Sequence, residues 1–187
     1  MGLRETKKRR IAESVLKAAQ RLFLEQGVAA TTMQAIAGDA GISRASLFNY
    51  YPGKEVIVAA LAARMEPRLV QLVHHYQSRT ATTGECIDAL FDHLAKVVGP
   101  TVELTRLLFV QGNGGVAYPQ LAAALTDLVS NGQRQGDVRS DKSAPALSEL
   151  LYLEVVACLL GWAFTEQMSE RELFRRRAEL VKANLLV

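Results

Sequence analysis

Cysteine is scarce in this chain of 187 residues: there are only two, Cys86 and Cys158, and they lie far apart in the sequence. Neither belongs to a Cys-x-x-Cys pair or to a cluster of cysteines and histidines, so no structural zinc site is expected. We interpret both as reduced, buried thiols, although their spacing alone leaves a disulfide open. A chain of this length buries enough surface to fold without a disulfide or a metal ion.

Proline and glycine are also few, at 5 and 13 residues, which excludes a collagen-like or low-complexity chain. Hydrophobic residues make up 49% and charged residues 22%, so the chain is not intrinsically disordered. The longest apolar run, 150–164, contains Glu154 and is shorter than the roughly 20 residues that a membrane span needs. The N-terminus lacks the apolar core of a secretory signal. We therefore expect no membrane partner and a cytoplasmic location.

Net charge is low, at +3, but it is unevenly distributed along the chain. Residues 1–55 contain nine Lys or Arg and five Asp or Glu, whereas residues 56–187 contain thirteen and fourteen. The first ten residues alone hold five basic side chains and a single acidic one, Glu5. A basic N-terminal segment joined to a near-neutral remainder is typical of a protein that binds nucleic acid with one end.

Helical periodicity dominates the sequence, and no stretch shows the sustained two-residue alternation of a strand or an internal repeat. In the first segment, for example, Ile11, Val15 and Leu22 recur on one face of a helix. We expect an all-α fold of about nine helices, with a three-helix unit over residues 1–54 and a helical bundle over 55–187. The expected helices cover 8–26, 32–40, 43–51, 55–78 (kinked or divided at Pro67), 83–98, 101–110, 118–133, 145–168 and 169–186.

Residues 33–50, MQAIAGDAGISRASLFNY, have the pattern of two short helices joined by a tight turn. Thr31 or Thr32 can cap the first helix, and Ser43 can cap the second. Gly41 can adopt the positive φ that the turn needs, and Ala37 is small enough for the second helix to approach. The remaining positions supply an apolar shared core: Ile36, Ala40, Ile42, Leu47 and Tyr50. The segment therefore predicts a helix-turn-helix.

The surrounding sequence, ATTMQAIAGDAGISRASLFNYYPGKEVIVAAL, closely resembles the DNA-binding region of the TetR family of transcriptional repressors. The matching positions are Gly27, Thr31, Thr32, Ile36, Ala37, Ala40, Gly41, Ile42, Ser43, Ser46, Leu47, Tyr50, Tyr51, Lys54 and Glu55. Outside residues 8–60 the resemblance rests on helical architecture and chain length. It implies a repressor that binds a near-palindromic operator in double-stranded DNA as a homodimer and is released by a small-molecule effector.

In a helix-turn-helix the second helix enters the major groove and presents its outward residues to the base edges. Arg44 is the strongest candidate for base readout, because a guanidinium can bond O6 and N7 of guanine together. Asn49 can read adenine or bond a phosphate, and Ala45 can touch a thymine methyl group. Gln34, on the first helix of the motif, can reach a base or the backbone.

Phosphate contacts set the register of a DNA-binding protein without reading the sequence. The candidates are basic or hydroxyl-bearing residues: Lys8, Arg9, Thr32, Ser43, Ser46, Tyr50 and Lys54. Lys8 and Arg9 belong to a basic arm, residues 4–10, which either contacts DNA, the minor groove included, or is a solvated, disordered tail. For Thr32 the alternative is a purely structural cap, and for Tyr50 it is a place in the core.

Phe48 is a candidate DNA contact that departs from the family's pattern. The family usually has a tyrosine at this place, and the resemblance assigns its hydroxyl to a DNA phosphate. Phenylalanine can stack or pack but cannot donate that hydrogen bond. Either Tyr50 or Tyr51 takes over the contact, or the contact is lost.

The resemblance assigns the remaining helices to effector binding and dimerisation. Candidate effector contacts are residues at core spacing, each of which could equally be ordinary packing: Met65, His75, Phe91, Phe109, Tyr118, Tyr152 and Trp162. The helix expected over 145–168 is apolar almost all round, so it needs cover from its own bundle and from a partner subunit. Candidate dimer contacts on it and on the last helix are Leu151, Val155, Leu159, Leu173, Leu180 and Asn184.

No metal ion or other cofactor is expected, since the adjacent His74 and His75 point to different faces of a helix. Two other classes of protein compete with a repressor. A helical enzyme is disfavoured because HExxH, GxSxG, P-loop and paired-carboxylate patterns are all absent. The other alternative keeps the helix-turn-helix as an interaction module, or as a repressor without a ligand. We expect a ligand-responsive repressor and no enzymatic activity.

Overall fold

The computed structural model describes residues 2–98, 104–105, 107–108, 118–160 and 169–187. These residues are helical apart from loops and an isolated β-bridge between Val138 and Leu186, so the predicted all-α fold is confirmed. The chain divides into two compact units, Met1–Arg64 and Met65–Val187. We name them the head and the body. None of the described helices is long and apolar enough to cross a membrane.

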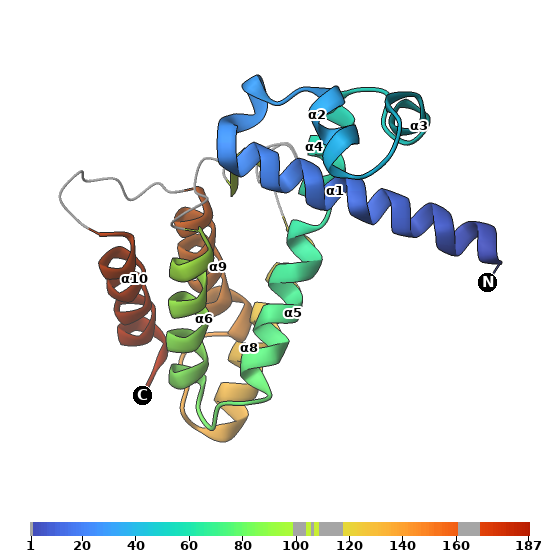
Figure 1. Ribbon diagram of the computed structural model, residues 1–187. Coiled ribbons are helices and arrows are strands. Elements are labelled where there is room, and N and C mark those ends of the chain that lie inside the picture. The colour runs from blue at the N-terminus through green and yellow to red at the C-terminus, as the bar shows by residue number, and fades with distance from the viewer. Residues whose placement is uncertain (1, 99–103, 106, 109–117, 161–168) are drawn as a thin grey trace. The chain divides into compact units, whose positions relative to one another are not determined.

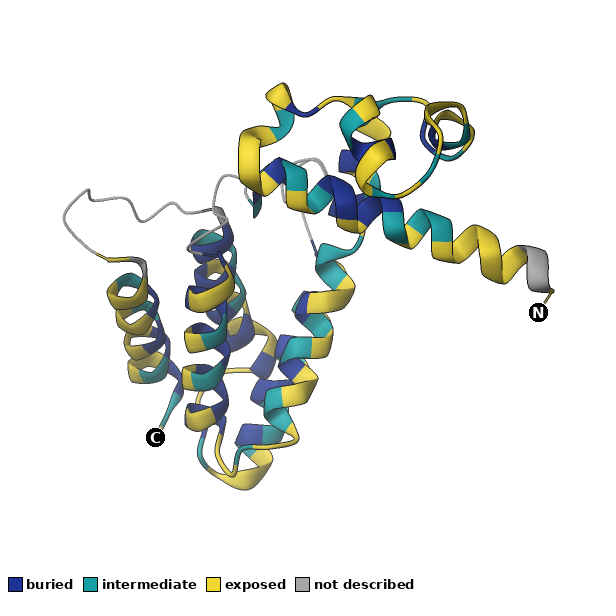
Figure 2. Ribbon diagram, viewed as in Figure 1, coloured by how far each residue is buried: buried dark blue, intermediate teal, exposed yellow. Residues whose placement is uncertain are grey.

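The head consists of four helices, α1 (Leu3–Ala30), α2 (Met33–Asp39), α3 (Arg44–Tyr50) and α4 (Lys54–Ala62) (Figure 1). Apolar side chains from all four are buried at its centre, where the dark blue residues of α1 and α4 meet in Figure 2. They include Val15, Ala19 and Phe23 of α1, Ile36 of α2, Leu47 of α3, and Ile57 and Leu61 of α4.

The head extends ten residues beyond the expected boundary at residue 54. One reason is that α4 buries Ile57 and Leu61 within it. A second reason is Arg64, whose guanidinium bonds both carboxylate oxygens of Glu13 on α1, at 3.1 and 2.9 Å. These contacts make α4 and the residues that follow it part of the head.

The basic N-terminal run is helical, because α1 begins at Leu3 and not at Lys8. Of the two alternatives given for this segment, the disordered tail does not agree with the structure. At its other end, Gly27 interrupts the regular helix as expected: its φ of 79° and ψ of 160° are not helical, and one further turn reaches Ala30. Glycine adopts such a φ without the steric cost that a side chain would bring.

The body contains α5 (Met65–Gln77), α6 (Thr83–Val98), α8 (Pro119–Gln135), α9 (Ala144–Leu160) and α10 (Glu170–Leu185). The helix expected over 55–78, either kinked or divided, is divided into α4 and α5. The break precedes Pro67, which lies in the first turn of α5, where its missing N–H breaks no helical hydrogen bond. Most of the helix expected over 101–110 lies outside the described residues.

One apolar cluster joins these five helices. In this cluster α8 packs mainly against α9 and α5, and α6 packs against α10. Both cysteines belong to it, unpaired, so the interpretation as buried thiols is confirmed. Burial raises the pKa of Cys86 to about 11 and that of Cys158 to about 12.

Polar side chains fix the register of the helices around this cluster. Asp137, in the loop before α9, accepts hydrogen bonds from the N–H and the hydroxyl of Thr83 at 2.6 and 3.0 Å, and so caps α6. Arg177 of α10 bonds the largely buried carboxylate of Glu154 on α9 at 2.6 Å. Both pairs join residues far apart in the sequence.

Candidate nucleic-acid interface

Side-chain caps fix the helices on both sides of the turn between α2 and α3. Thr32 Oγ1 accepts a hydrogen bond from the N–H of Ala35 at 3.1 Å. Ser43 Oγ accepts one from the N–H of Ser46, also at 3.1 Å. Each cap satisfies a backbone donor that the first turn leaves open and is worth about 1 kcal/mol. Each hydroxyl keeps its own proton, which can still be donated to a phosphate.

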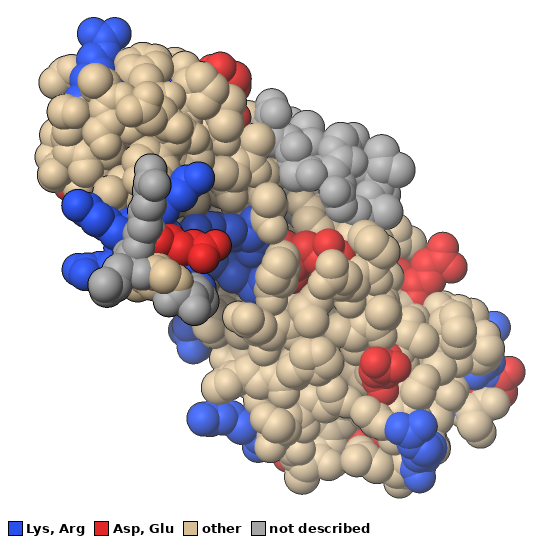
Figure 3. Space-filling model, turned by 90° about the vertical axis from the view of Figure 1, so that its right-hand side faces the viewer, with Lys and Arg blue, Asp and Glu red and all other residues tan. Residues whose placement is uncertain are grey.

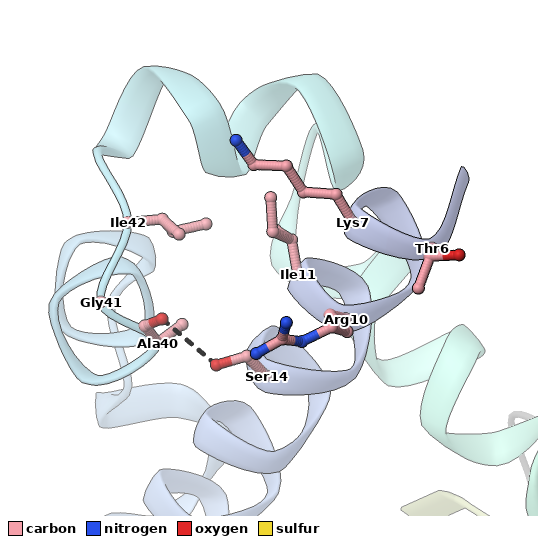
Figure 4. Close-up of a pocket in the computed structure, with 8 residues that line it drawn as sticks. All are labelled: Thr6, Lys7, Arg10, Ile11, Ser14, Ala40, Gly41 and Ile42. Carbon is pink, nitrogen blue, oxygen red and sulfur yellow. Dashed lines mark hydrogen bonds between the residues drawn. The ribbon is translucent and has the colours of Figure 1, made fainter. Parts of the chain in front are cut away.

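A small apolar contact holds the two helices where they cross. Ile36, Ala37 and Leu47 all have 0% exposure. The turn between them is tied to α1, because the hydroxyl of Ser14 donates to the carbonyl oxygen of Ala40 at 3.2 Å (Figure 4). These contacts fix the direction of α3 relative to the rest of the head.

The expected core of the motif needs one correction. Tyr50 is only half-buried, as are Ala40 and Ile42, whereas Tyr51 is buried with 9% exposure. Tyr51 lies one helical turn after Leu47 and therefore falls on the same inward face. The ring of Tyr50 lies at the edge of that face, so its hydroxyl stays a candidate for a phosphate contact.

The opposite face of α3 carries the residues predicted to read bases. Arg44, Ala45, Phe48 and Asn49 are all exposed, and their spacing places them on one side of the helix. Ser46 is half-buried, while Gln34 on α2 is exposed. The structure thus gathers the predicted readout residues of α3 on one exposed surface.

Phe48 lies on this surface with 38% exposure. Its ring lies under the guanidinium of Arg44, whose Cζ is 5.4 Å from the ring centroid. This distance is within the range of a cation–π contact. The sequence left open whether the Phe48 ring stacks or packs, and in the structure it stacks against the guanidinium of Arg44.

Lys54 was expected to contact a phosphate, but the structure gives its ammonium group a different task. Nζ donates to the carbonyl oxygens of Val28, Ala29 and Thr31 at 2.5, 3.1 and 2.9 Å. An ammonium group has three protons, so all of them are used inside the head. Lys54 therefore stabilises the irregular end of α1, next to the Thr32 cap, and the phosphate prediction does not fit this geometry.

The exposed basic residues of α1 flank the helix-turn-helix on two sides. A groove of about 620 Å³ runs between α1 and the turn, lined by Thr6, Lys7, Arg10, Ile11, Ser14, Ala40, Gly41 and Ile42 (Figure 4). A second groove, of about 660 Å³, is lined by Glu5, Lys7, Lys8, Ile11, Ser46, Asn49 and Tyr50. Figure 3 shows Lys and Arg side chains gathered around this end of α1. Lys8 thus lies beside α3, whereas Arg9 lines neither groove.

Several predicted effector contacts meet at the start of α8. The N–H of Tyr118 donates to the hydroxyl oxygen of Tyr152 at 3.0 Å. Next to Met65, Glu66 accepts from the N–H groups of Gln120 and Leu121 at 2.6 and 3.3 Å. Burial, with the nearby charge of Glu66 and the neighbouring Tyr152, raises the pKa of Tyr118 to about 12.

The other effector candidates are more scattered. Phe91 is buried and lines a groove of about 300 Å³ between α6 and α10, together with charged residues of both helices. His75 is exposed on α5, edge-on to Tyr76, so the expectation that it occupies a core position is wrong. Helical spacing misassigned it because Val73 and Tyr76 take the inward positions nearby. Phe109 and Trp162 lie outside the described residues.

The predicted dimer contacts also need correction. Leu151, Val155 and Leu159 are 0, 1 and 1% exposed inside the body itself, so they cannot contact a partner. Leu180 and Asn184 are exposed on α10, and Leu173 is half-exposed. Among the residues of α9 whose burial is described, Leu153 is an exposed large apolar side chain, at 54%. Because α9 is apolar on every side, its sequence carried no signal for which side faces inward.

A capped turn, a second helix with an arginine and an asparagine on its exposed face, and a basic helix beside it define a helix-turn-helix DNA-binding protein. Residues 15–61 match the family model described as bacterial regulatory proteins, TetR family. This match identifies the head as a DNA-binding domain of the TetR family, a family of transcriptional regulators and not of enzymes.

Solved structures of TetR-family proteins share the fold over almost the whole chain. The chain is similar to Thermus thermophilus FadR, a repressor in complex with lauroyl-CoA, with 24% identity, a TM-score of 0.65, and coverage of 94% of this chain and 95% of that one. It is also similar to Bacillus subtilis FadR in complex with stearoyl-CoA, with 17% identity, a TM-score of 0.66, and coverage of 91% of this chain and 97% of that one. A TetR/AcrR-family regulator from Thermobifida fusca has 17% identity to the chain and a TM-score of 0.69, with coverage of 94% of this chain and 97% of that one. A search of curated proteins found no significant match.

Proposed function

We propose that this chain is a ligand-responsive repressor that binds a near-palindromic DNA operator as a homodimer and releases it on binding a small-molecule effector. The exposed face of α3, with Arg44 and Asn49 on it, is the observation that carries the proposal. Such a face reads base edges in the major groove, while the basic end of α1 adds sequence-independent affinity by displacing counterions. The function places the protein in the cytoplasm, where its operator would be.

The phosphate contacts we propose come from the rim of this face. Thr32, Ser43 and Ser46 each have a hydroxyl proton to donate, and Tyr50 extends from the edge of α3. Lys8 contributes from α1, beside the groove that Asn49 also lines. Lys54 acts indirectly, because it holds the chain segment that carries Thr32. These groups set the register, and Arg44 supplies the sequence preference.

Dimerisation is proposed to use the outward faces of α9 and α10. Leu153 and Leu180 are exposed large apolar side chains, at 54% and 46%. Asn184, one turn beyond Leu180, is exposed as well. Two such helices from each subunit would form a four-helix interface about a two-fold axis. A two-fold dimer presents two α3 helices, which accounts for a near-palindromic operator.

The effector is proposed to be apolar or amphipathic and to bind in the body, near Met65, Tyr118 and Tyr152. Two supporting observations are available. Two structural neighbours were solved with the long-chain thioesters lauroyl-CoA and stearoyl-CoA, and a third, SmeT, with triclosan. Within the body, aromatic and polar groups converge at the start of α8. An effector that favours one arrangement of the dimer lowers DNA affinity by its differential binding to that arrangement.

DNA binding is tested by fluorescence anisotropy with duplexes from the region upstream of the chain's own gene. We expect saturable binding to one segment, weakened by about 1–3 kcal/mol in Arg44→Ala, with relaxed preference at one base position. Arg79→Ala removes the same charge from the body and should leave affinity unchanged. Binding without any sequence preference in the wild type would contradict the proposal.

Dimerisation is tested by light scattering at micromolar concentration. The wild type should be a dimer, and Leu180→Glu should be a monomer because it places a charge in the interface. Leu24→Glu, at a residue with 43% exposure on the head, is the matched control and should stay dimeric. A monomeric wild type would rule out the interface.

Effector binding is tested by thermal shift and DNA release with lauroyl-CoA, stearoyl-CoA and triclosan as first probes.

A further inference from the structure

Phe48 is an anomaly on the face of α3 that we assign to DNA. Its three exposed neighbours on that face are Arg44, Ala45 and Asn49, none of which is a large apolar residue. Burial does not explain the ring, since Phe48 is 38% exposed and Leu47, at 0%, fills the core side of the helix. A single exposed ring is common on protein surfaces, so a role for Phe48 has to follow from what the ring contacts.

The partner that the structure shows is Arg44. The guanidinium Cζ lies 5.4 Å from the centre of the Phe48 ring, one helical turn away. Among the described residues Arg44 has no carboxylate partner, whereas Arg21 pairs with Glu25 and Asp39. The N–H groups of Arg44 are therefore available to a ligand while the face of its guanidinium is stacked.

We propose that Phe48 is a positioning residue for base readout: its ring holds the guanidinium of Arg44 in the orientation that bonds guanine. The inference rests on the proposed DNA-binding function. A free arginine samples many rotamers, and ordering them on binding costs entropy. A ring that stacks on the guanidinium before DNA binds removes part of that entropic cost. Stacking covers only the face of the guanidinium, so the N–H donors along its edge remain free.

This role does not need the hydroxyl that Phe48 lacks. A tyrosine at position 48 could both stack under Arg44 and bond a phosphate, whereas Phe48 can only stack. If stacking is the function retained in this chain, Phe48 affects which base is preferred and has no direct effect on the number of phosphates contacted. The two roles differ in measurable ways, because phosphate contacts change the salt dependence of binding.

The test uses full-length protein and the duplex that the wild type selects from a randomised pool. Arg44→Ala first identifies the guanine whose replacement no longer matters. Phe48→Leu keeps an apolar side chain but removes the ring. We expect it to reduce discrimination at that guanine by about two- to fivefold, the fold-change that corresponds to an exposed cation–π contact. Discrimination at other positions and the slope of affinity against salt should not change.

Three further variants make the result specific. Phe48→Tyr keeps the ring and should retain the preference at that guanine. In the Arg44→Ala background, Phe48→Leu should cause no additional loss, because its effect acts through the arginine. Val56→Ala, at a residue with the same 38% exposure on the head, should leave the preference unchanged. Circular dichroism melts confirm that each variant is folded.

Each other outcome overturns the proposal. Equal weakening on all duplexes would mean that Phe48 touches DNA directly or only supports the fold. No effect of Phe48→Leu, or an effect that persists without Arg44, would show that the ring does not position the guanidinium. If Arg44→Ala keeps the full base preference, the positioning role fails while DNA binding stands. If the wild type selects no duplex, it is the proposed function that fails.

Discussion

The head and the body are stabilised in different ways. In the head, polar side chains that bond to the backbone fix the segments around the turn: Thr32 and Ser43 cap helices, Lys54 donates to three carbonyl groups, and Ser14 ties the turn to α1. In the body, a continuous apolar cluster joins five described helices, and side-chain pairs such as Glu154–Arg177 and Thr126–Ser148 connect neighbouring helices. The head therefore presents a fixed polar surface, while the body encloses apolar surface.

This difference suits the functions we propose. Base readout needs donors held in place within a fraction of an ångström, which hydrogen bonds and caps provide. An apolar effector needs a site lined mainly by apolar side chains with a few placed polar groups, and the body supplies residues of both kinds. Substitutions can test how far each unit depends on its own kind of contact.

The largest effect is expected from the core of the body. Leu151→Ala removes a side chain with 0% exposure from α9 and should lower the free energy of unfolding by about 2–5 kcal/mol, since a cavity remains. Leu153→Ala, two residues on with 54% exposure, should cost much less in stability. Urea denaturation compares the two. Similar losses would mean that α9 does not face the way the structure shows.

A smaller effect is expected from the main polar contact of the head. Lys54→Met keeps the aliphatic stem but leaves three carbonyl groups at the end of α1 without their donor. We expect a loss of about 1–3 kcal/mol in stability and faster hydrogen exchange around residues 28–35. Lys17→Met, at an exposed site on α1, is the control. Unchanged stability with a reduced salt slope of DNA binding would instead support the phosphate contact first expected.

Alkaline pH should weaken the body. The pKa of Tyr118 is raised from 10.0 to about 12 in the folded state, mainly by burial, so folding favours the neutral ring. The stabilisation is fully present below pH 10 and is lost as pH rises from 10 to 12. Stability should therefore fall over this window, and less steeply in Tyr118→Phe. Parallel declines in the two proteins, measured by urea denaturation, would show that Tyr118 does not contribute.

The smallest effect is expected at the start of α8, which has no side-chain cap of its own. Glu66 supplies that cap from α5, with Oε1 bonded to the N–H groups of Gln120 and Leu121. Glu66→Ala should cost about 0.5–2 kcal/mol and speed exchange of those two amides. The control Glu149→Ala removes an exposed carboxylate from α9. If exchange at Gln120 is unaffected, the cap has no energetic weight.

Much of the head could be predicted because its signals are local. Thr32, Gly41 and Ser43 act on residues at most four positions away, so their roles follow from spacing. The exposed face of α3 follows from the helical period once Leu47 is placed in the core. The same reasoning failed for Lys54, because the carbonyl groups that it binds are more than twenty residues away in the sequence.

The body was less predictable. Its described helices could be located from their periodicity, and the last one begins with a local cap, in which Ser169 Oγ accepts a hydrogen bond from the N–H of Glu172 at 3.3 Å. The inward face of α9 was not, since Leu150, Leu151 and Leu153 are equally apolar and only packing distinguishes them. His75 was misplaced because Val73 and Tyr76 take the inward positions next to it on α5.

The sequence by itself determined which of the described segments are largely helical, that the chain carries a helix-turn-helix, and that its positive charge lies at one end. These features depend on residues within a turn or two of each other. Only the tertiary structure decided which side of α9 is covered, what Lys54 binds, and how Glu66 caps α8. Those contacts join segments distant in the sequence, and their geometry is set by packing the whole unit at once.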